Sequence, residues 1–169
     1  MAIELNSDLS KAAQRLANAL ADKNVRIVFA ESCTAGLVSA TLAQVPGISQ
    51  WHCGSAVVYR ETTKTAWLAI PPEMIEKHGV VSAEVAQLMA AGVLQFTPEA
   101  DISAAITGHL GPDAPLELDG VVYIAVARRE APNVIFESVE RVALTTSARG
   151  ERQREATLAV LKQAARVLA

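Results

Sequence analysis

The chain has 169 residues, 51% hydrophobic and 20% charged, which is enough apolar material for one globular core and argues against a disordered chain. A net charge of −3 gives no basic surface for nucleic acid. No apolar run is long enough to span a membrane, and no signal peptide follows Met1. We expect a single domain over residues 1–169, in the cytoplasm, without nucleic-acid or membrane partners. The aliphatic surplus favours a homo-oligomer.

Apolar residues at helical spacing predict a series of helices. Leucines and alanines recur on one face from residue 9 to 20, after Ser7 or Asp8, either of which can cap the first turn. A later helix ends at Pro46-Gly47, because proline cannot continue a helix. Ser82 is a good N-cap for another. The predicted helices span residues 9–20, 34–44, 62–68, 73–78, 83–94 and 148–168.

Short apolar or β-branched runs predict the strands. They span residues 26–30, 51–59, 102–107, 121–128 and 134–142. The last two runs are joined by Ala131-Pro132-Asn133, as in a hairpin. Because the earlier strands alternate with helices, we expect an α/β fold, a three-layer α/β/α sandwich around a mixed sheet.

Ser32 lies where the strand over residues 26–30 meets the following predicted helix. At such a junction, backbone amides and the positive end of the helix dipole lie close to the hydroxyl and favour an oxyanion there. The same position suits a serine that only caps the helix. No Gly-x-Ser-x-Gly elbow surrounds Ser32, so the local pattern fits both a nucleophile and a cap.

Tyr59 and Lys64 flank the end of the next predicted strand, at the sheet edge where open α/β sheets bind ligands. A lysine that desolvation has freed of its proton can act as the general base for a serine. A solvated surface lysine and a half-buried strand tyrosine fit the same two positions. Both interpretations stay open at this point.

Gly108-His-Leu-Gly111 follows a buried strand and can offer successive backbone amides to a phosphate, or form a plain turn. Arg149, at the start of the last helix, fits a solvated face or an anion contact. The histidines and the two cysteines, Cys33 and Cys53, lack paired metal-binding spacing. We therefore expect no metal site and two reduced thiols.

Three segments together carry a resemblance to a known family. Residues 30–34 read A-E-S-C-T, Tyr59 and Lys64 match the Tyr and Lys of a Y-S-N-x-x-K segment, and residues 78–82 read H-G-V-V-S. In this order and spacing they resemble the CinA C-terminal-domain family, which includes stand-alone nicotinamide mononucleotide deamidases of the PncC type. The agreement extends over the whole chain.

The resemblance implies an α/β sandwich, without cofactor or metal, that hydrolyses the carboxamide of a pyridine nucleotide, a small-molecule substrate. It implies Ser32 as nucleophile, Lys64 as base and Tyr59 as relay or orienter. Backbone amides near Thr34 and Ala35 receive the oxyanion in this scheme. The residues implied to lie near the substrate are Glu31, Glu61, Thr107, Gly108, Gly111 and Arg149.

The chain departs from the family pattern where the substrate is recognised. Glu61 stands where the family usually has asparagine, and the glycine-rich loop after residue 107 loses its trailing glycines. Glu117 and Asp119 occupy a segment that in the family carries a lysine. The usual second arginine of the last helix falls at Gln153.

We therefore expect an amidohydrolase with nicotinamide mononucleotide as the leading substrate. Two alternatives stay open: a diverged enzyme for a different, less anionic amide, and a non-catalytic nucleotide-binding or regulatory module that keeps the fold. The added carboxylates favour altered specificity. The intact Ser32, Tyr59 and Lys64 favour retained catalysis.

Overall fold

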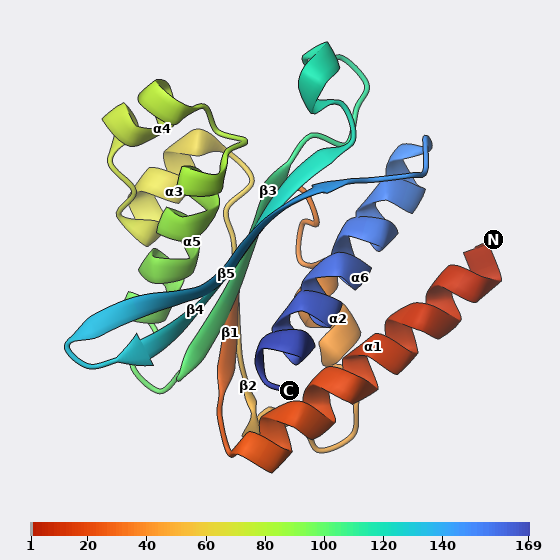
Figure 1. Cartoon of the computed structure of the whole chain (residues 1–169), viewed down its shortest axis with the longest axis vertical. Coiled ribbons are helices and arrows are strands. Elements are labelled where there is room, and N and C mark those ends of the chain that lie inside the picture. Colours follow the sequence, from red (N-terminus) through yellow and green to blue (C-terminus); the bar gives the residue numbers. More distant parts are fainter. Residues whose placement is uncertain (1) are drawn as a thin grey trace.

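A five-stranded mixed sheet forms the middle layer of the structure, a computed structural model that describes residues 2–169 (Figure 1). Its strands are β1 (Ile27–Glu31), β2 (His52–Val57), β3 (Ile102–Gly108), β4 (Val121–Glu130) and β5 (Asn133–Ala143). The strand order is β2-β1-β3-β4-β5. β1 pairs in parallel with β2 and β3, whereas β4 runs antiparallel to β3 and β5. The predicted mixed sheet and terminal hairpin are confirmed.

Helices cover both faces of the sheet. They are α1 (Ala2–Lys23), α2 (Leu37–Leu42), α3 (Glu61–Leu68), α4 (Pro72–His78), α5 (Ala83–Gln95) and α6 (Arg149–Val167). α1, α2 and α6 lie on one face and α3, α4 and α5 on the other (Figure 1). This arrangement confirms the three-layer sandwich. Among the described residues, none of these helices is both long enough and apolar enough to cross a membrane.

The sequence of β1 reflects its place between two helical layers. Side chains of a strand alternate between the two faces of a sheet. Ile27 and Phe29 accordingly pack into the core beneath α1, α2 and α6, and Val28 and Ala30 into the core beneath α5. Both faces are buried, so the strand is a continuous apolar run rather than an alternating one.

Two predicted helix boundaries are wrong, while a third is confirmed. α1 begins at Ala2, so Ser7 and Asp8 lie within the helix; no glycine or proline precedes them to stop it. α2 spans only Leu37–Leu42, well short of the predicted 34–44. At the start of α5, Ser82 Oγ accepts from the Val85 N–H (3.2 Å), which confirms the predicted cap.

The short α2 is explained by the backbone before it. Ala35 and Gly36 both have left-handed φ values, 53° and 95°. A right-handed helix cannot pass through such residues, so the chain makes a turn over residues 33–36 before α2 begins. At its other end α2 gives way to turns and a short 3-10 helix, Ile48–Gln50, rather than continuing to Pro46.

Close packing between α3 and α5 depends on a glycine. A Cβ atom at Gly92 of α5 would overlap the Leu68 carbonyl oxygen and lie 3.0 Å from Leu68 Cβ. The absence of a side chain therefore lets α5 approach the end of α3. Because α3 also carries Lys64, this approach bears on the site described below.

Gly92→Ala should lower the free energy of unfolding by about 1–3 kcal/mol, because the added methyl group meets rigid backbone. Gly150→Ala is the matched control, since its Cβ would have only an ordinary 3.7 Å contact in α6. The control should raise stability by up to about 1 kcal/mol, as alanine does for glycine in a helix. Urea denaturation of both variants measures the difference; an unchanged Gly92→Ala protein would contradict the packing argument.

Candidate active site

A cavity of about 210 Å³ lies at the carboxyl ends of β1 and β3. Ser32 directly follows β1, and its N–H donates to Ile106 of β3 (3.1 Å). Thr107 and Gly108 end β3, while Tyr59 follows β2. The residues lining the cavity are Ser32, Cys33, Tyr59, Lys64, Val80, Val81, Thr107, Gly108, His109, Leu110, Gly111, Pro112 and Arg149. The sheet therefore brings most of the predicted site residues together.

Ser32 and Lys64 are in direct contact inside this cavity. Lys64 Nζ donates to Ser32 Oγ (2.9 Å) and to the Val58 carbonyl (2.8 Å). The lysine is fully buried. Burial lowers the pKa of Lys64 from its ordinary value of 10.5 to about 8, because desolvation disfavours the ammonium form. A substantial fraction of the amine is therefore neutral slightly above pH 7, and a neutral amine accepts a proton from a hydroxyl.

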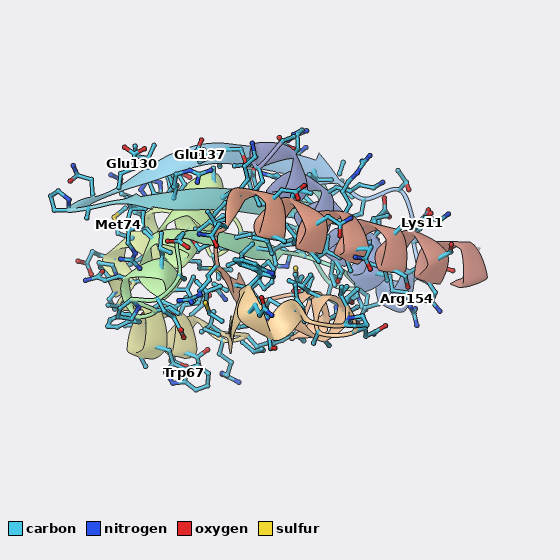
Figure 2. The ribbon with its side chains drawn as sticks, turned by 90° about the horizontal axis from the view of Figure 1, so that it is seen from below. Lys11, Trp67, Met74, Glu130, Glu137 and Arg154 are labelled. Atoms are coloured by element: carbon cyan, nitrogen blue, oxygen red, sulfur yellow. The ribbon has the colours of Figure 1, made fainter. Side chains whose placement is uncertain are left out.

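The helix that carries Lys64 inverts the usual pattern of burial. α3 exposes 56% of Trp67, which projects outward in Figure 2, while its lysine is fully enclosed. Lysine is rarely buried without a charged partner. The backbone carbonyl of Val58 and the hydroxyl of Ser32 are the polar groups that hold Lys64 in place. Burial of this kind, next to a potential nucleophile, marks a candidate catalytic base.

Glu31 organises the turn that presents Ser32. Its buried carboxylate accepts hydrogen bonds from both backbone and hydroxyl donors. The donors are Thr34 Oγ1 (2.8 Å), Gly36 N (2.9 Å), Val38 N (3.0 Å), Ser39 N (3.0 Å) and Ser55 Oγ (3.0 Å). Glu31 does not line the cavity, so the structure places it beneath the site rather than beside a substrate. The free amides at the start of α2 point at Glu31, not at Ser32 as expected from a strand–helix junction.

The backbone amides after Ser32 differ in their availability. The Ala35 N–H donates to the Ser32 carbonyl (3.1 Å), so this amide is already engaged. Within residues 2–169, the N–H groups of Cys33 and Thr34 donate to no protein acceptor. Gln153 Nε2 donates to the Thr34 carbonyl (2.9 Å) and ties α6 to the turn. Of the two expected oxyanion donors, only Thr34 has an N–H without a protein acceptor, and neither Thr34 nor Ala35 lines the cavity.

Both cysteines are free thiols in the structure. Burial raises the pKa of the Cys33 thiol to about 12. Cys33 therefore remains protonated at neutral pH and is a poor nucleophile, although it lines the same cavity as Ser32. Over the part of the chain that the structure describes, no group of three or more His, Cys, Asp and Glu side chains is placed to hold a metal ion.

Arg149 links two sides of the cavity. Its guanidinium donates to the Gly111 carbonyl and to the Tyr59 hydroxyl, the latter at 2.7 Å. Tyr59 is 52% exposed, so this contact lies near the mouth. Both acceptors are uncharged, and the positive charge of Arg149 is not neutralised by them. Tyr59 makes its hydrogen bond to Arg149 rather than to Ser32 or Lys64.

The loop after β3 supplies a wall of the cavity. Thr107 Oγ1 donates to the Val80 carbonyl (2.8 Å), which joins this wall to the segment between α4 and α5. At Gly108 a Cβ atom would overlap Val122 Cγ1 and lie 2.8 Å from the Val121 carbonyl, so only glycine fits. The lining residues Val80, Val81, His109, Leu110 and Pro112 are not among the individual site residues predicted from the sequence, although all but Pro112 lie in segments that it marks. The H-G-V-V-S segment was the signal for the first two.

The carboxylates that distinguish this chain from its family pattern lie outside the cavity. Glu61 lines a separate cavity of about 610 Å³ beside α3 and α4, which shares Val80 with the first. Asp119 receives two hydrogen bonds from Arg152, at 2.7 and 2.9 Å, and these hold the pKa of Asp119 below its ordinary value. Glu117 is exposed. None of the three lines the Ser32 cavity.

The fold and the site together define an α/β sandwich with a buried Ser–Lys pair at the carboxyl edge of its sheet. Comparison with protein families matches residues 9–168 to the CinA C-terminal domain. The chain belongs to this family, as the resemblance predicted.

Sequence and structure comparisons agree with this assignment. A CinA-like protein from Desulfotalea psychrophila is 40% identical over 122 residues, which cover 71% of this chain and 29% of that protein. The chain spans less than a third of the length of the curated relatives it matches. A competence-damaged protein (CinA) superfamily structure from Klebsiella pneumoniae is 25% identical, with a TM-score of 0.86 and coverage of 95% of this chain and 97% of that one. The competence/damage inducible protein CihA from Agrobacterium tumefaciens is 26% identical, with the same TM-score and 95% coverage of both chains.

Glu31→Gln should destabilise the fold strongly, because an amide group would face N–H donors that now bind a carboxylate. Loss of charged hydrogen bonds and an unsatisfied donor predict a decrease of about 3 kcal/mol in the free energy of unfolding. Urea denaturation measures it. Glu61→Gln, on the exposed start of α3, is the matched control and should change stability by less than about 0.5 kcal/mol. Equal effects in the two variants would show that Glu31 does not hold the turn.

Lys64→Met should stabilise the protein at pH 7. The pKa of Lys64 is about 8 in the folded protein and near its ordinary value of 10.5 when unfolded. Between about pH 8 and 10.5, Lys64 is protonated in the unfolded chain but largely neutral in the folded protein. The free energy of unfolding of the wild type, relative to that of the variant, therefore rises with pH over this range and is lowest below about pH 8. Denaturation curves of both proteins from pH 7 to 10.5 test this, and a difference independent of pH would contradict it.

Proposed function

We propose that this protein is an amidohydrolase in which Ser32 is the nucleophile and Lys64 the general base, with the carboxamide of nicotinamide mononucleotide as its leading substrate. The observation that carries the proposal is the 2.9 Å contact between Lys64 Nζ and Ser32 Oγ. Burial lowers the pKa of this lysine to about 8. A base with a pKa near the working pH is the most effective proton acceptor.

In the first half of the reaction, Ser32 Oγ attacks the carboxamide carbon while its proton passes to the neutral Lys64 amine. The Val58 carbonyl stays hydrogen-bonded to that amine (2.8 Å) and stabilises the ammonium that forms. The oxyanion of the tetrahedral intermediate is received by the N–H group of Cys33, which lines the cavity and donates to no protein acceptor among residues 2–169. The intermediate then breaks its carbon–nitrogen bond, Lys64 returns the proton to the leaving nitrogen, and ammonia departs.

In the second half, water hydrolyses the ester on Ser32. Lys64, neutral again, takes a proton from the water as its oxygen bonds to the acyl carbon. The bond to Ser32 Oγ breaks and Lys64 gives the proton to that oxygen. The carboxylic acid product loses its remaining proton to solvent and leaves as a carboxylate. Tyr59 orients the substrate together with Arg149, its hydrogen-bond partner (2.7 Å), rather than relaying a proton from Ser32.

The charge at the mouth of the cavity supports a nucleotide substrate. A cavity of about 210 Å³ is smaller than the roughly 300–1,000 Å³ of sites that enclose whole ligands, so it takes an amide-bearing ring and leaves the remainder at the mouth. Arg149 lies there with only uncharged acceptors and suits a phosphate. The pairing of Asp119 with Arg152 removes one of the carboxylates that argued for a less anionic substrate.

A second candidate is an amide with a neutral or cationic remainder. Glu61 and Glu76 line the larger neighbouring cavity, which shares Val80 with the Ser32 cavity. A substrate that extended to that side would meet negative charge and could not carry a phosphate there. Turnover of an uncharged pyridine carboxamide in preference to nicotinamide mononucleotide would favour this candidate.

The wild-type protein should release ammonia from nicotinamide mononucleotide, and Ser32→Ala should lower the rate by at least about 1,000-fold, as loss of a nucleophile typically does. An enzyme-coupled ammonia assay measures both, with circular dichroism to check the fold. Cys33→Ser is the matched control, since it changes the adjacent cavity residue but not the nucleophile, and it should keep most of the activity. Turnover by Ser32→Ala at the wild-type rate would exclude Ser32 as nucleophile.

The same assay across pH tests the base. The rate should rise with pH and level off above about 8, because the reactive form of Lys64 is the one without the proton, whose pKa is about 8. Lys64→Arg should be as inactive as Lys64→Ala, because a guanidinium keeps its proton at these pH values. An active arginine variant would instead assign Lys64 a purely electrostatic role.

A further inference from the structure

The loop from Gly108 to Gly120 forms one wall of the cavity but is long and largely exposed. It supplies five lining residues, from Gly108 to Pro112. Its middle projects from the sheet next to the start of α6 (Figure 1), and Leu116 is 93% exposed there. Residues 108–112 can form a fixed wall of the cavity only if the loop is held by contacts with the rest of the fold.

The Arg152 guanidinium provides such a contact, beside a longer hydrogen bond from Arg141 to the Glu117 carbonyl (3.3 Å). Its two terminal nitrogens donate to the two oxygens of Asp119, at 2.7 and 2.9 Å, and Nε donates to the Thr146 carbonyl (2.9 Å). The Arg152 side chain is only 12% exposed. A bidentate arginine–carboxylate pair fixes both distance and orientation, so it fastens the end of the loop to α6.

Two glycines show that the loop is shaped around this guanidinium. A Cβ atom at Gly111 would lie 2.9 Å from both Arg152 Nη1 and Asp119 Oδ1. At Gly120 it would lie 3.1 Å from Arg152 Nη2. Both glycines have left-handed φ values, 66° and 69°. The two ends of the loop thus close on Arg152, which distinguishes this pair from an ordinary surface ion pair.

The same loop holds the cationic residue at the cavity mouth. Gly111, packed against Arg152, accepts the hydrogen bond from Arg149, which also donates to Tyr59. Displacement of Gly111 would therefore release Arg149 and shift the wall. Arg152 and Asp119 themselves do not line the cavity.

We propose that the Arg152–Asp119 pair positions the 108–112 wall and, through Gly111, the Arg149 guanidinium for substrate binding. This inference rests on the proposed amide hydrolysis for its effect on turnover. Arg152 and Asp119 are positioning residues, since they act through Gly111 and Arg149. From the sequence alone, Asp119 counts as an added negative charge. In the structure its charge is paired with that of Arg152 on α6.

Asp119→Ala tests the proposal with two readouts. The KM for nicotinamide mononucleotide should rise about tenfold or more, with kcat changed less than about threefold, because binding geometry is lost while the Ser32–Lys64 contact remains. The pH profile should keep its inflection near that of the wild type. Independently of activity, amide hydrogen exchange in residues 109–120 should accelerate, since the N–H groups of His109 and Gly120 are now hydrogen-bonded.

Controls separate positioning from general stability. Glu137→Ala removes another ion pair, Arg128–Glu137, on the β4–β5 hairpin, and Glu137 is labelled in Figure 2. This variant should leave both KM and exchange in the loop unchanged. Arg152→Lys keeps the positive charge but loses the planar guanidinium that binds both carboxylate oxygens. This variant should give a KM between those of the wild type and Asp119→Ala. If Asp119→Ala does not fold, Asp119→Asn replaces it in both measurements.

The outcomes for loop and reaction are distinguishable. A higher KM with faster exchange supports the inference. An active enzyme whose KM and exchange are both unchanged in Asp119→Ala overturns it, as does an equal rise of KM in Glu137→Ala. If the wild type releases no ammonia, the proposed function fails, and hydrogen exchange alone decides whether Arg152 holds the loop.

Discussion

The buried carboxylate of Glu31 is the constraint on which the site depends. A charge in the interior is tolerated only if its oxygens are fully hydrogen-bonded, and this one collects donors from the turn, from α2 and from Ser55 of β2. Those donors must converge on one point, so the chain cannot continue from β1 directly into a helix. The resulting turn leaves Ser32 at the edge of the sheet with its hydroxyl free to contact Lys64.

Lys64 adds a second constraint that works against stability. A buried amine is most costly when it is protonated, and desolvation accordingly lowers the pKa of Lys64 to about 8, although the charge of Glu61 acts in the opposite direction. The helix that supplies it is held close by the contact of Gly92 with Leu68. The packing of α3 on α5 therefore fixes how deeply the lysine is placed, and with it how readily it loses its proton. The protonation of Lys64 is thus linked to the absence of a side chain at Gly92, a residue that does not line the cavity.

The sequence predicted the architecture better than it predicted the site. Buried apolar runs and their alternation with amphipathic helices are local signals, so the mixed sheet and its two helical layers followed from them. The errors lie where distant groups decide the backbone. α2 is shorter than predicted because Ala35 and Gly36 adopt left-handed φ values. The amides of Gly36, Val38 and Ser39 then converge on Glu31, which lies outside the window 34–44. The sequence likewise does not reveal the partners of Glu31, because donors from the turn, from α2 and from β2 converge on its carboxylate only in three dimensions.

The carboxylates of Glu61 and Asp119 show that the number of charged residues in a sequence does not by itself give the electrostatic potential at a site. Both were read as negative potential near the substrate. In the fold, Asp119 is paired with Arg152, whereas Glu61 faces another cavity. An added charge changes the potential at a ligand only if it stays unpaired and close. In the Arg152–Asp119 pair the two opposite charges cancel each other locally. The charge at the mouth of the cavity is that of Arg149. Ser32 and Lys64 are positioned by β1 and α3, while the mouth of the cavity is formed by the β3–β4 loop and the start of α6. The two sets of contacts meet at a few hydrogen bonds, such as the one from Gln153 of α6 to the Thr34 carbonyl. Arg152 and Asp119, which hold the end of the loop, make no contact with Ser32 or Lys64.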